Sequence, residues 1–120
     1  MDTQIDKQGR VSVVRPKGRL DFSAAADFQA RVDQALAGDG AAPAAVIIDA
    51  AGLEYVSSAG LRVFLVGARN AKGAGVGFGV CGLVPAVSDV FALSGFDRII
   101  TGSASVDDAI AASTEADTLM

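Results

Sequence analysis

Residues 44–65 read AAVIIDAAGLEYVSSAGLRVFL, and the fold is best predicted outward from this stretch. The run Val46–Ile48 is β-branched and too short for a helix, so it predicts a buried strand that ends at Asp49. The apolar residues at 53–56 are expected only to bridge this strand to the next element. Apolar residues then recur with helical spacing from about 58 to 71, which predicts a helix.

Two serines, Ser57 and Ser58, stand where this helix should begin. One of them is expected to cap its free backbone N–H groups. If Ser57 is the cap, Ser58 falls in the first turn with a free hydroxyl, where a phosphate would meet N–H donors and the positive end of the helix dipole. Gly60 is expected to keep the helix surface bare, so that another protein can approach closely. The residues alone leave open a plainer interpretation, in which both serines merely start a helix.

Three short motifs share an order and spacing along the chain: Gly18-Arg19-Leu20-Asp21, Ser57-Ser58-Ala59-Gly60-Leu61 and Leu93-Ser94-Gly95-Phe96. Together they resemble the motifs of STAS domains and, more narrowly, of the bacterial anti-sigma factor antagonists, also called anti-anti-sigma factors. The resemblance extends from about Ile5 to Ala112. It implies an α/β fold of the STAS type, with helices packed on a mixed β-sheet. We expect a single domain over residues 1–120, with a core over about 5–112 and a frayed polar tail at 113–120.

In that family, the serine two places before the motif glycine, here Ser58, is phosphorylated by a partner serine kinase. The resemblance implies that the unmodified protein binds an anti-sigma factor that is itself this kinase, and so releases a sigma factor. Phosphorylation would break the complex and a PP2C-type phosphatase would restore it. ATP and Mg would be bound by the kinase, so no cofactor or metal is expected here. Two positions depart from the commonest pattern, because Ser57 stands where many members have Asp and Ala59 where many have Ser or Thr.

The expected contact surface joins two turns and one helix face. Asp21 is equally well explained as a helix cap, and Arg62 lies four residues after Ser58, on the same helix face. The residues expected to contact the partner are Asp21, Ser23, Ser57, Ser58, Ala59, Gly60 and Arg62. STAS modules of stress-signalling scaffolds, secretion regulators and lipid-transport assemblies remain an alternative.

Catalysis is disfavoured by the residues present. Ser58 at a strand-to-helix turn resembles a nucleophile elbow, but Val56 occupies the position of the first glycine of that motif. A serine nucleophile needs a base, usually histidine, and the chain has no histidine. With one cysteine and no histidine, a metal-ligand cluster is not expected either. The sequence therefore predicts that the protein is not an enzyme.

A glycine-rich stretch, GAGVGFGVCG at residues 73–82, contains a nominal dinucleotide fingerprint, Gly77-x-Gly79-x-x-Gly82. A functional fingerprint lies in a turn between a strand and a helix. Here the apolar residues Val76, Phe78 and Val80 alternate through the glycines, as in a strand. We therefore predict a strand and reject nucleotide binding.

Composition limits the other classes of function. The 120 residues are 51% hydrophobic, which suits one domain with an ample core, and the lone Cys81 is expected in it. A net charge of −4 argues against nucleic-acid binding and suits a partner with a basic contact face. No apolar run reaches the roughly 18 residues of a membrane span, and the N-terminus is unlike a signal peptide. A cytoplasmic protein without membrane insertion is expected.

The remaining elements follow from periodicity and from turn residues. Strands are predicted at 2–8, from 11 to about 16, at 76–80 and at 96–100, and helices at 22–37, 85–93 and from a cap at Ser105 to about 112. The predicted turn at 18–21 leads into the first helix. Strands and helices alternate after an opening hairpin, which predicts a mixed sheet with a helical layer.

Overall fold

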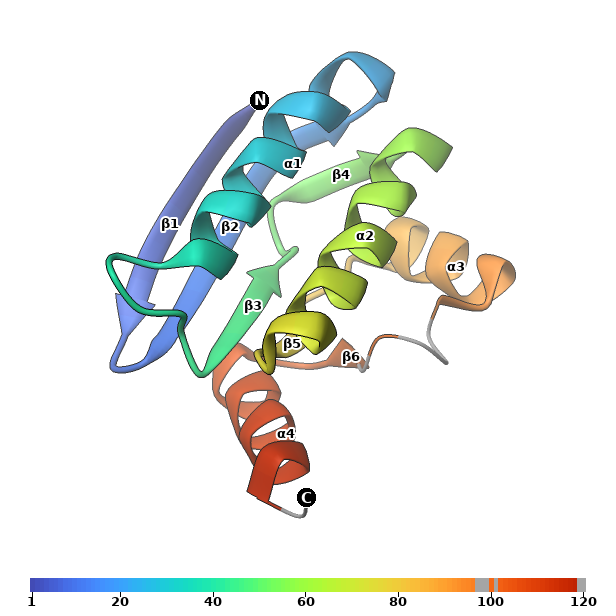
Figure 1. Cartoon of the computed structure of the whole chain (residues 1–120). Helices are drawn as coiled ribbons and strands as arrows, with labels where there is room; N and C mark the ends of the chain where they lie inside the picture. Colours follow the sequence, from blue (N-terminus) through green and yellow to red (C-terminus); the bar gives the residue numbers. More distant parts are fainter. Residues whose placement is uncertain (97–99, 101, 119–120) are drawn as a thin grey trace.

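The computed structural model describes residues 1–96, 100 and 102–118, which form a mixed β-sheet flanked by helices (Figure 1). This part of the chain contains six strands and four helices. In chain order they are β1 (Asp2–Gln8), β2 (Val11–Leu20), α1 (Phe22–Ala37), β3 (Ala45–Asp49), β4 (Leu53–Val56), α2 (Ser58–Ala74), β5 (Gly77–Cys81), α3 (Pro85–Ser94), β6 (Gly102–Ser103) and α4 (Val106–Thr118).

The sheet has the strand order β1-β2-β3-β5-β6, and β4 pairs separately with β2. β1 and β2 form an antiparallel hairpin, and the other pairs are parallel. β2 is longer than predicted: it was expected to end near Pro16, and it continues to Leu20. Its first half pairs with β3 up to Val14, and its last residues, from Gly18, pair with β4, with a register shift between Gly18 and Arg19. Pro16, which cannot donate a hydrogen bond to a ladder, lies between these two pairing segments.

The hydrophobic core is divided between the two faces of the sheet. On one face, α1, α2 and α3 cover a core that contains Phe28, Phe64 and Phe91, whose ring centroids lie 5.5 Å and 5.1 Å apart in sequence order. On the other face, α4 packs through Ala109 against a smaller cluster that includes Cys81. The expected helical layer is therefore divided, with α4 on its own face of the sheet (Figure 1).

Several elements follow the sequence prediction closely. The alternation through the glycines forms β5, so Gly77 and Gly79 lie in a strand and not in a phosphate-binding turn. Gly95 ends α3 in the left-handed conformation, with φ of 78°. Ser105 caps α4 by accepting a hydrogen bond from the Asp108 N–H at 3.2 Å.

Other elements differ from the prediction. The strand expected over 96–100 falls mostly outside the described residues, and the last described strand is β6 at Gly102–Ser103. The bridge at 53–56 is a strand, β4, and the helix expected to end at about 112 continues to Thr118. No helix in the described part of the chain has the length and apolar character needed to cross a membrane.

Candidate functional site

The candidate site lies where two strands end side by side and each leads into a helix. Leu20 at the end of β2 pairs with Val56 at the end of β4. The backbone N–H of Ser57 donates a hydrogen bond to the Leu20 carbonyl oxygen at 2.9 Å. The first turns of α1 and α2 are therefore held next to each other by the sheet.

Ser57 is the cap of α2. Its backbone is extended, with φ of −80° and ψ of 172°, and its Oγ accepts a hydrogen bond from the Gly60 N–H at 3.1 Å. Its carbonyl oxygen accepts the Leu61 N–H at 2.9 Å, which begins the helical ladder. The sequence allowed either serine to be the cap. In the structure the cap is Ser57, so the Ser58 side chain does not take part in capping.

Ser58 is the first residue of α2 and is exposed. Its hydroxyl makes no hydrogen bond with any residue that the structure describes. It lies in the first helical turn, where unpaired N–H groups and the helix dipole favour a negative group. The hydroxyl is therefore accessible from solvent at the start of α2.

Gly60 has a different role from the one expected. It is buried, and a Cβ at this position would lie 2.6 Å from Leu20 Cγ and 2.9 Å from the Leu20 carbonyl oxygen. Real Cβ atoms do not approach other atoms this closely. The bare surface at Gly60 therefore lets α2 pack against β2, and the expectation that it serves the approach of a partner is wrong.

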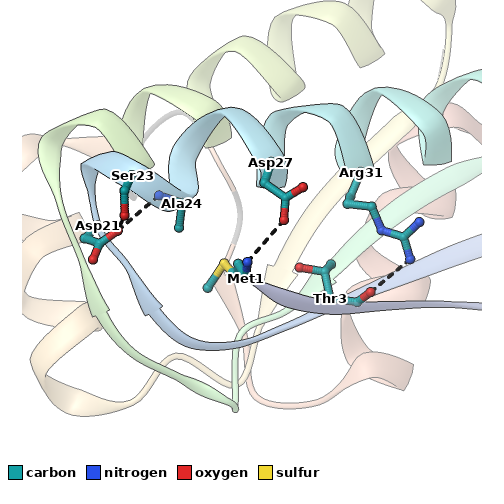
Figure 2. A network of polar contacts seen from close by, with 7 residues as sticks. All are labelled: Met1, Thr3, Asp21, Ser23, Ala24, Asp27 and Arg31. Carbon is teal, nitrogen blue, oxygen red and sulfur yellow. Dashed lines mark hydrogen bonds and ion pairs between the residues drawn. The ribbon is translucent and has the colours of Figure 1, made fainter.

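The first turn of α1 is capped by Asp21 (Figure 2). Its Oδ1 accepts hydrogen bonds from the Ser23 hydroxyl at 2.8 Å and from the Ala24 N–H at 3.0 Å. The bond from Ser23, followed by the bond from Ala24, holds the pKa of Asp21 below its ordinary value of 3.8. The cap is thus anionic at neutral pH, and the exposed Ser23 is oriented by it.

Helix α1 is also tied to the edge strand of the sheet (Figure 2). The Arg31 guanidinium donates to the Thr3 carbonyl oxygen at 2.9 Å, and the amino group of Met1 lies 3.2 Å from Asp27. These contacts join the middle of α1 to β1, the strand at the edge of the sheet.

A groove of about 590 Å³ runs between α1 and α2, beside Ser58. Its lining is mainly apolar, with Phe22, Ala25 and Ala26 from α1 and Ala59, Val63 and Val66 from α2. Arg62 and Gln29 also border it. Of the residues predicted to contact a partner, the structure brings Ser58, Ala59 and Arg62 together at this groove, whereas Asp21 and Ser57 are engaged as caps.

Phe22 was missed by the sequence reasoning. Its side chain is 84% exposed and lines the groove. One sequence feature could have indicated its exposure. Phe22 follows the cap Asp21 directly and lies outside the buried stripe of α1 that contains Phe28 and Val32. An exposed aromatic side chain next to an apolar groove is typical of a protein-binding surface.

The described residues offer little chemistry elsewhere. No three of the histidine, cysteine, aspartate and glutamate side chains in the described part of the chain group as a metal site requires. Cys81 is buried as expected, and burial, with the nearby Asp49 carboxylate, raises the pKa of its thiol to about 11. This thiol is therefore protonated at neutral pH and is a poor nucleophile.

Comparison with known proteins gives the same family as the motifs. The family model described as the STAS domain matches residues 2–109. BtrV of Bordetella bronchiseptica, whose name describes a candidate anti-sigma factor antagonist, is 40% identical over 67 residues. That match covers 56% of this chain and 58% of BtrV, so the chain spans less than two thirds of the curated relative.

Solved structures share the fold over nearly the whole chain. An anti-sigma factor antagonist from Mycobacterium paratuberculosis superposes with a TM-score of 0.83 and 26% identity, and the match covers 94% of this chain and 93% of that one. SpoIIAA in its unphosphorylated form matches with a TM-score of 0.75, 23% identity and coverage of 91% and 93%. Its phosphorylated form from Bacillus matches with a TM-score of 0.68, 22% identity and coverage of 91% and 96%. The SpoIIAA matches show the fold alone. The STAS family model matches nearly the whole length of this chain, and the chain therefore belongs to the STAS domain family.

Proposed function

We propose that this protein is an anti-sigma factor antagonist, switched by phosphorylation of Ser58. In its unmodified form it binds an anti-sigma factor that is also a serine kinase, and so releases a sigma factor. The observation that carries the proposal is the exposed Ser58 hydroxyl, free of described partners, beside an apolar groove and an exposed Phe22. Similarity to BtrV and to the Mycobacterium paratuberculosis antagonist supports the same class of partner.

The switch needs no refolding. A phosphate adds about −1.5 to −2 charges at neutral pH. In the complex, the partner would cover the rim of the groove, so the phosphate would have to lose its water or push the partner away. A loss of about 3 kcal/mol in binding free energy corresponds to roughly a 150-fold loss of affinity. In the free domain the same phosphate would remain in water at the start of α2, where the N–H groups favour it. A PP2C-type phosphatase would return the protein to its binding form.

We infer that the protein acts by binding and not by catalysis. The chain has no histidine to activate a serine, and the Ser58 hydroxyl has no hydrogen-bonded base among the described residues. ATP and Mg would be held by the kinase.

The direct test is to incubate the protein with its cognate anti-sigma factor kinase and ATP, and to locate the phosphate by mass spectrometry. We expect phosphate on Ser58 in the wild-type protein and in Ser57→Ala, and none in Ser58→Ala. Phosphate found only at another residue would reject the assignment of Ser58.

A binding assay tests the consequence. Ser58→Ala should bind the anti-sigma factor whether or not ATP is present, and Ser58→Asp should bind it weakly. Equal affinity of the two variants would reject the charge mechanism. If no anti-sigma factor binds any form, the alternative is a STAS interaction module of another assembly.

A further inference from the structure

Helix α2 differs in charge from the rest of the chain. It carries Arg62, Arg69 and Lys72 and no carboxylate, in a protein whose net charge is −4. All three cations are exposed, and none forms an ion pair with a residue that the structure describes. The exposed surface of α2 is therefore basic, although the protein as a whole is acidic. Its charge complements an acidic partner segment, not the basic contact face expected from the net charge.

Arg62 is placed differently from the other two cations. It is the only ionised side chain among the described residues that line the groove between α1 and α2. It also lies four residues after Ser58, so the Cβ atoms of the two residues are about 5–6 Å apart on one helix face. Arg62 thus borders the apolar groove and is also the helix-face neighbour of the hydroxyl that carries the proposed switch.

We propose that Arg62 is a shared counter-ion. In the unmodified protein it pairs with a carboxylate on a partner segment whose apolar side chains fill the groove; in the phosphorylated protein it pairs with the Ser58 phosphate instead. This inference rests on the proposed function and names the chemistry of the partner segment, which is acidic and apolar.

The competition follows from the chemistry of the groups. A guanidinium forms paired hydrogen bonds with carboxylates and with phosphates, and the i, i+4 spacing places Arg62 next to a phosphate on Ser58. No described carboxylate competes for Arg62. Once the phosphate holds Arg62, the partner carboxylate loses its counter-ion and also meets a new negative charge. Phosphorylation would therefore remove an attraction and add a repulsion in the same place.

Binding measurements on matched proteins test the first half. Phosphoserine is placed at position 58 by genetic-code expansion, which makes the test independent of any kinase. The anti-sigma factor is then titrated with modified and unmodified protein, each as wild type and as Arg62→Gln. We expect Arg62→Gln to weaken binding of the unmodified protein about tenfold, and the effect of phosphate to shrink by a similar factor. Arg69→Gln removes the same charge about 10 Å further along α2 and should change affinity less than about twofold.

A titration of the phosphate followed by ³¹P NMR tests the second half without any partner. The second pKa of a phosphoserine is about 6, and a neighbouring cation lowers it. We expect a lower midpoint in the wild-type protein than in Arg62→Gln, with Arg69→Gln matching wild type. Equal midpoints in all three proteins would overturn the pairing.

The outcomes separate this inference from the proposed function. If Arg62→Gln binds as tightly as wild type while phosphate still weakens binding, the inference fails and the proposed function stands. If Arg69→Gln weakens binding as much as Arg62→Gln, general charge explains the effect and the specific role of Arg62 is overturned. If the unmodified wild-type protein binds no anti-sigma factor, the proposed function fails, and the partner role of Arg62 fails with it.

Discussion

The backbone N–H of Ser57 donates a hydrogen bond to the carbonyl oxygen of Leu20 at 2.9 Å, across the last paired residues of β4 and β2. The bond joins the two strand ends from which α1 and α2 begin. Phe22 and Ser58 each follow within two residues of this bond, so the sheet fixes their relative position. Both residues therefore stand at the starts of helices that the paired strand ends hold side by side.

Gly60 is essential to this arrangement, and we predict that Gly60→Ala lowers the free energy of unfolding by about 1–3 kcal/mol. The added methyl group would collide with the Leu20 side chain and with the Leu20 carbonyl oxygen, which the bond to Ser57 holds in place. Urea unfolding measures the change.

The matched control is Gly73→Ala, in the same helix. A Cβ at Gly73 meets no atom within 4 Å, so alanine should stabilise α2 by up to about 1 kcal/mol. If Gly60→Ala is also stabilising, the close contact with Leu20 is not rigid and the first turn of α2 can shift.

Alanine substitution of the two adjacent serines should have different effects on stability. Ser57→Ala removes the cap of α2 and should cost about 1 kcal/mol, whereas Ser58→Ala removes an exposed hydroxyl without a described partner and should change stability by less than about 0.5 kcal/mol. Thermal unfolding of the two variants measures the difference. Equal losses would mean that Ser58 shares the capping role.

Local sequence signals predicted much of this fold, because capping, turn chemistry and hydrophobic periodicity act within a few residues. The start of α2, the hairpin after Gln8 and the glycine-rich strand β5 are such cases. The course of β2 past Pro16 was not predictable in this way. It depends on the pairing of Gly18–Leu20 with β4, a contact between segments far apart in the sequence.

In the candidate site, too, some features follow from local sequence and others depend on contacts between distant segments. Ser58 and Arg62 share one helix face, which helical spacing reveals. The groove also needs α1 beside α2, and that packing depends on the tertiary contact of the two helices. Phe22 was therefore missed as a surface residue, and Gly60 was misread, since nothing local indicates that its missing side chain faces Leu20.

The Asp21 cap should make stability depend on pH in acid. Because its pKa is lowered on folding, the unfolded chain takes up the proton first as the pH falls. The stabilisation by the carboxylate is therefore present above its unfolded pKa of about 4 and is lost as the pH falls through the lower folded value. Asp21→Asn keeps a capping oxygen but no charge, so the stability difference between wild type and this variant should be present at pH 6 and shrink in acid. A difference that does not vary with pH would contradict this explanation.

Cys81 should be inert in the native protein. Burial raises the pKa of its thiol to about 11 from an ordinary value of 9.0, so at pH 8 a thiol reagent should react only when the chain opens. The pH dependence of stability is opposite to that from Asp21, because here stability falls as the pH rises. The stabilisation by the buried thiol is complete below pH 9 and is lost as the pH rises toward 11, because the thiol of the unfolded chain ionises first. Cys81→Ala should lack this loss. Rapid labelling of native protein at pH 8 would show that the thiol is accessible.

Phe22 should matter for binding and not for folding. Its side chain is 84% exposed, so Phe22→Ala should leave the free energy of unfolding within about 0.5 kcal/mol of wild type. At the groove beside Ser58, however, an aromatic residue that a partner buries is expected to contribute at least tenfold to affinity. Leu93 on α3 is the matched control, because it is 89% exposed and does not line this groove. Titration of the anti-sigma factor with both variants decides which surface is used: a loss with Phe22→Ala alone supports the groove, and a loss with Leu93→Ala alone would move the interface to α3.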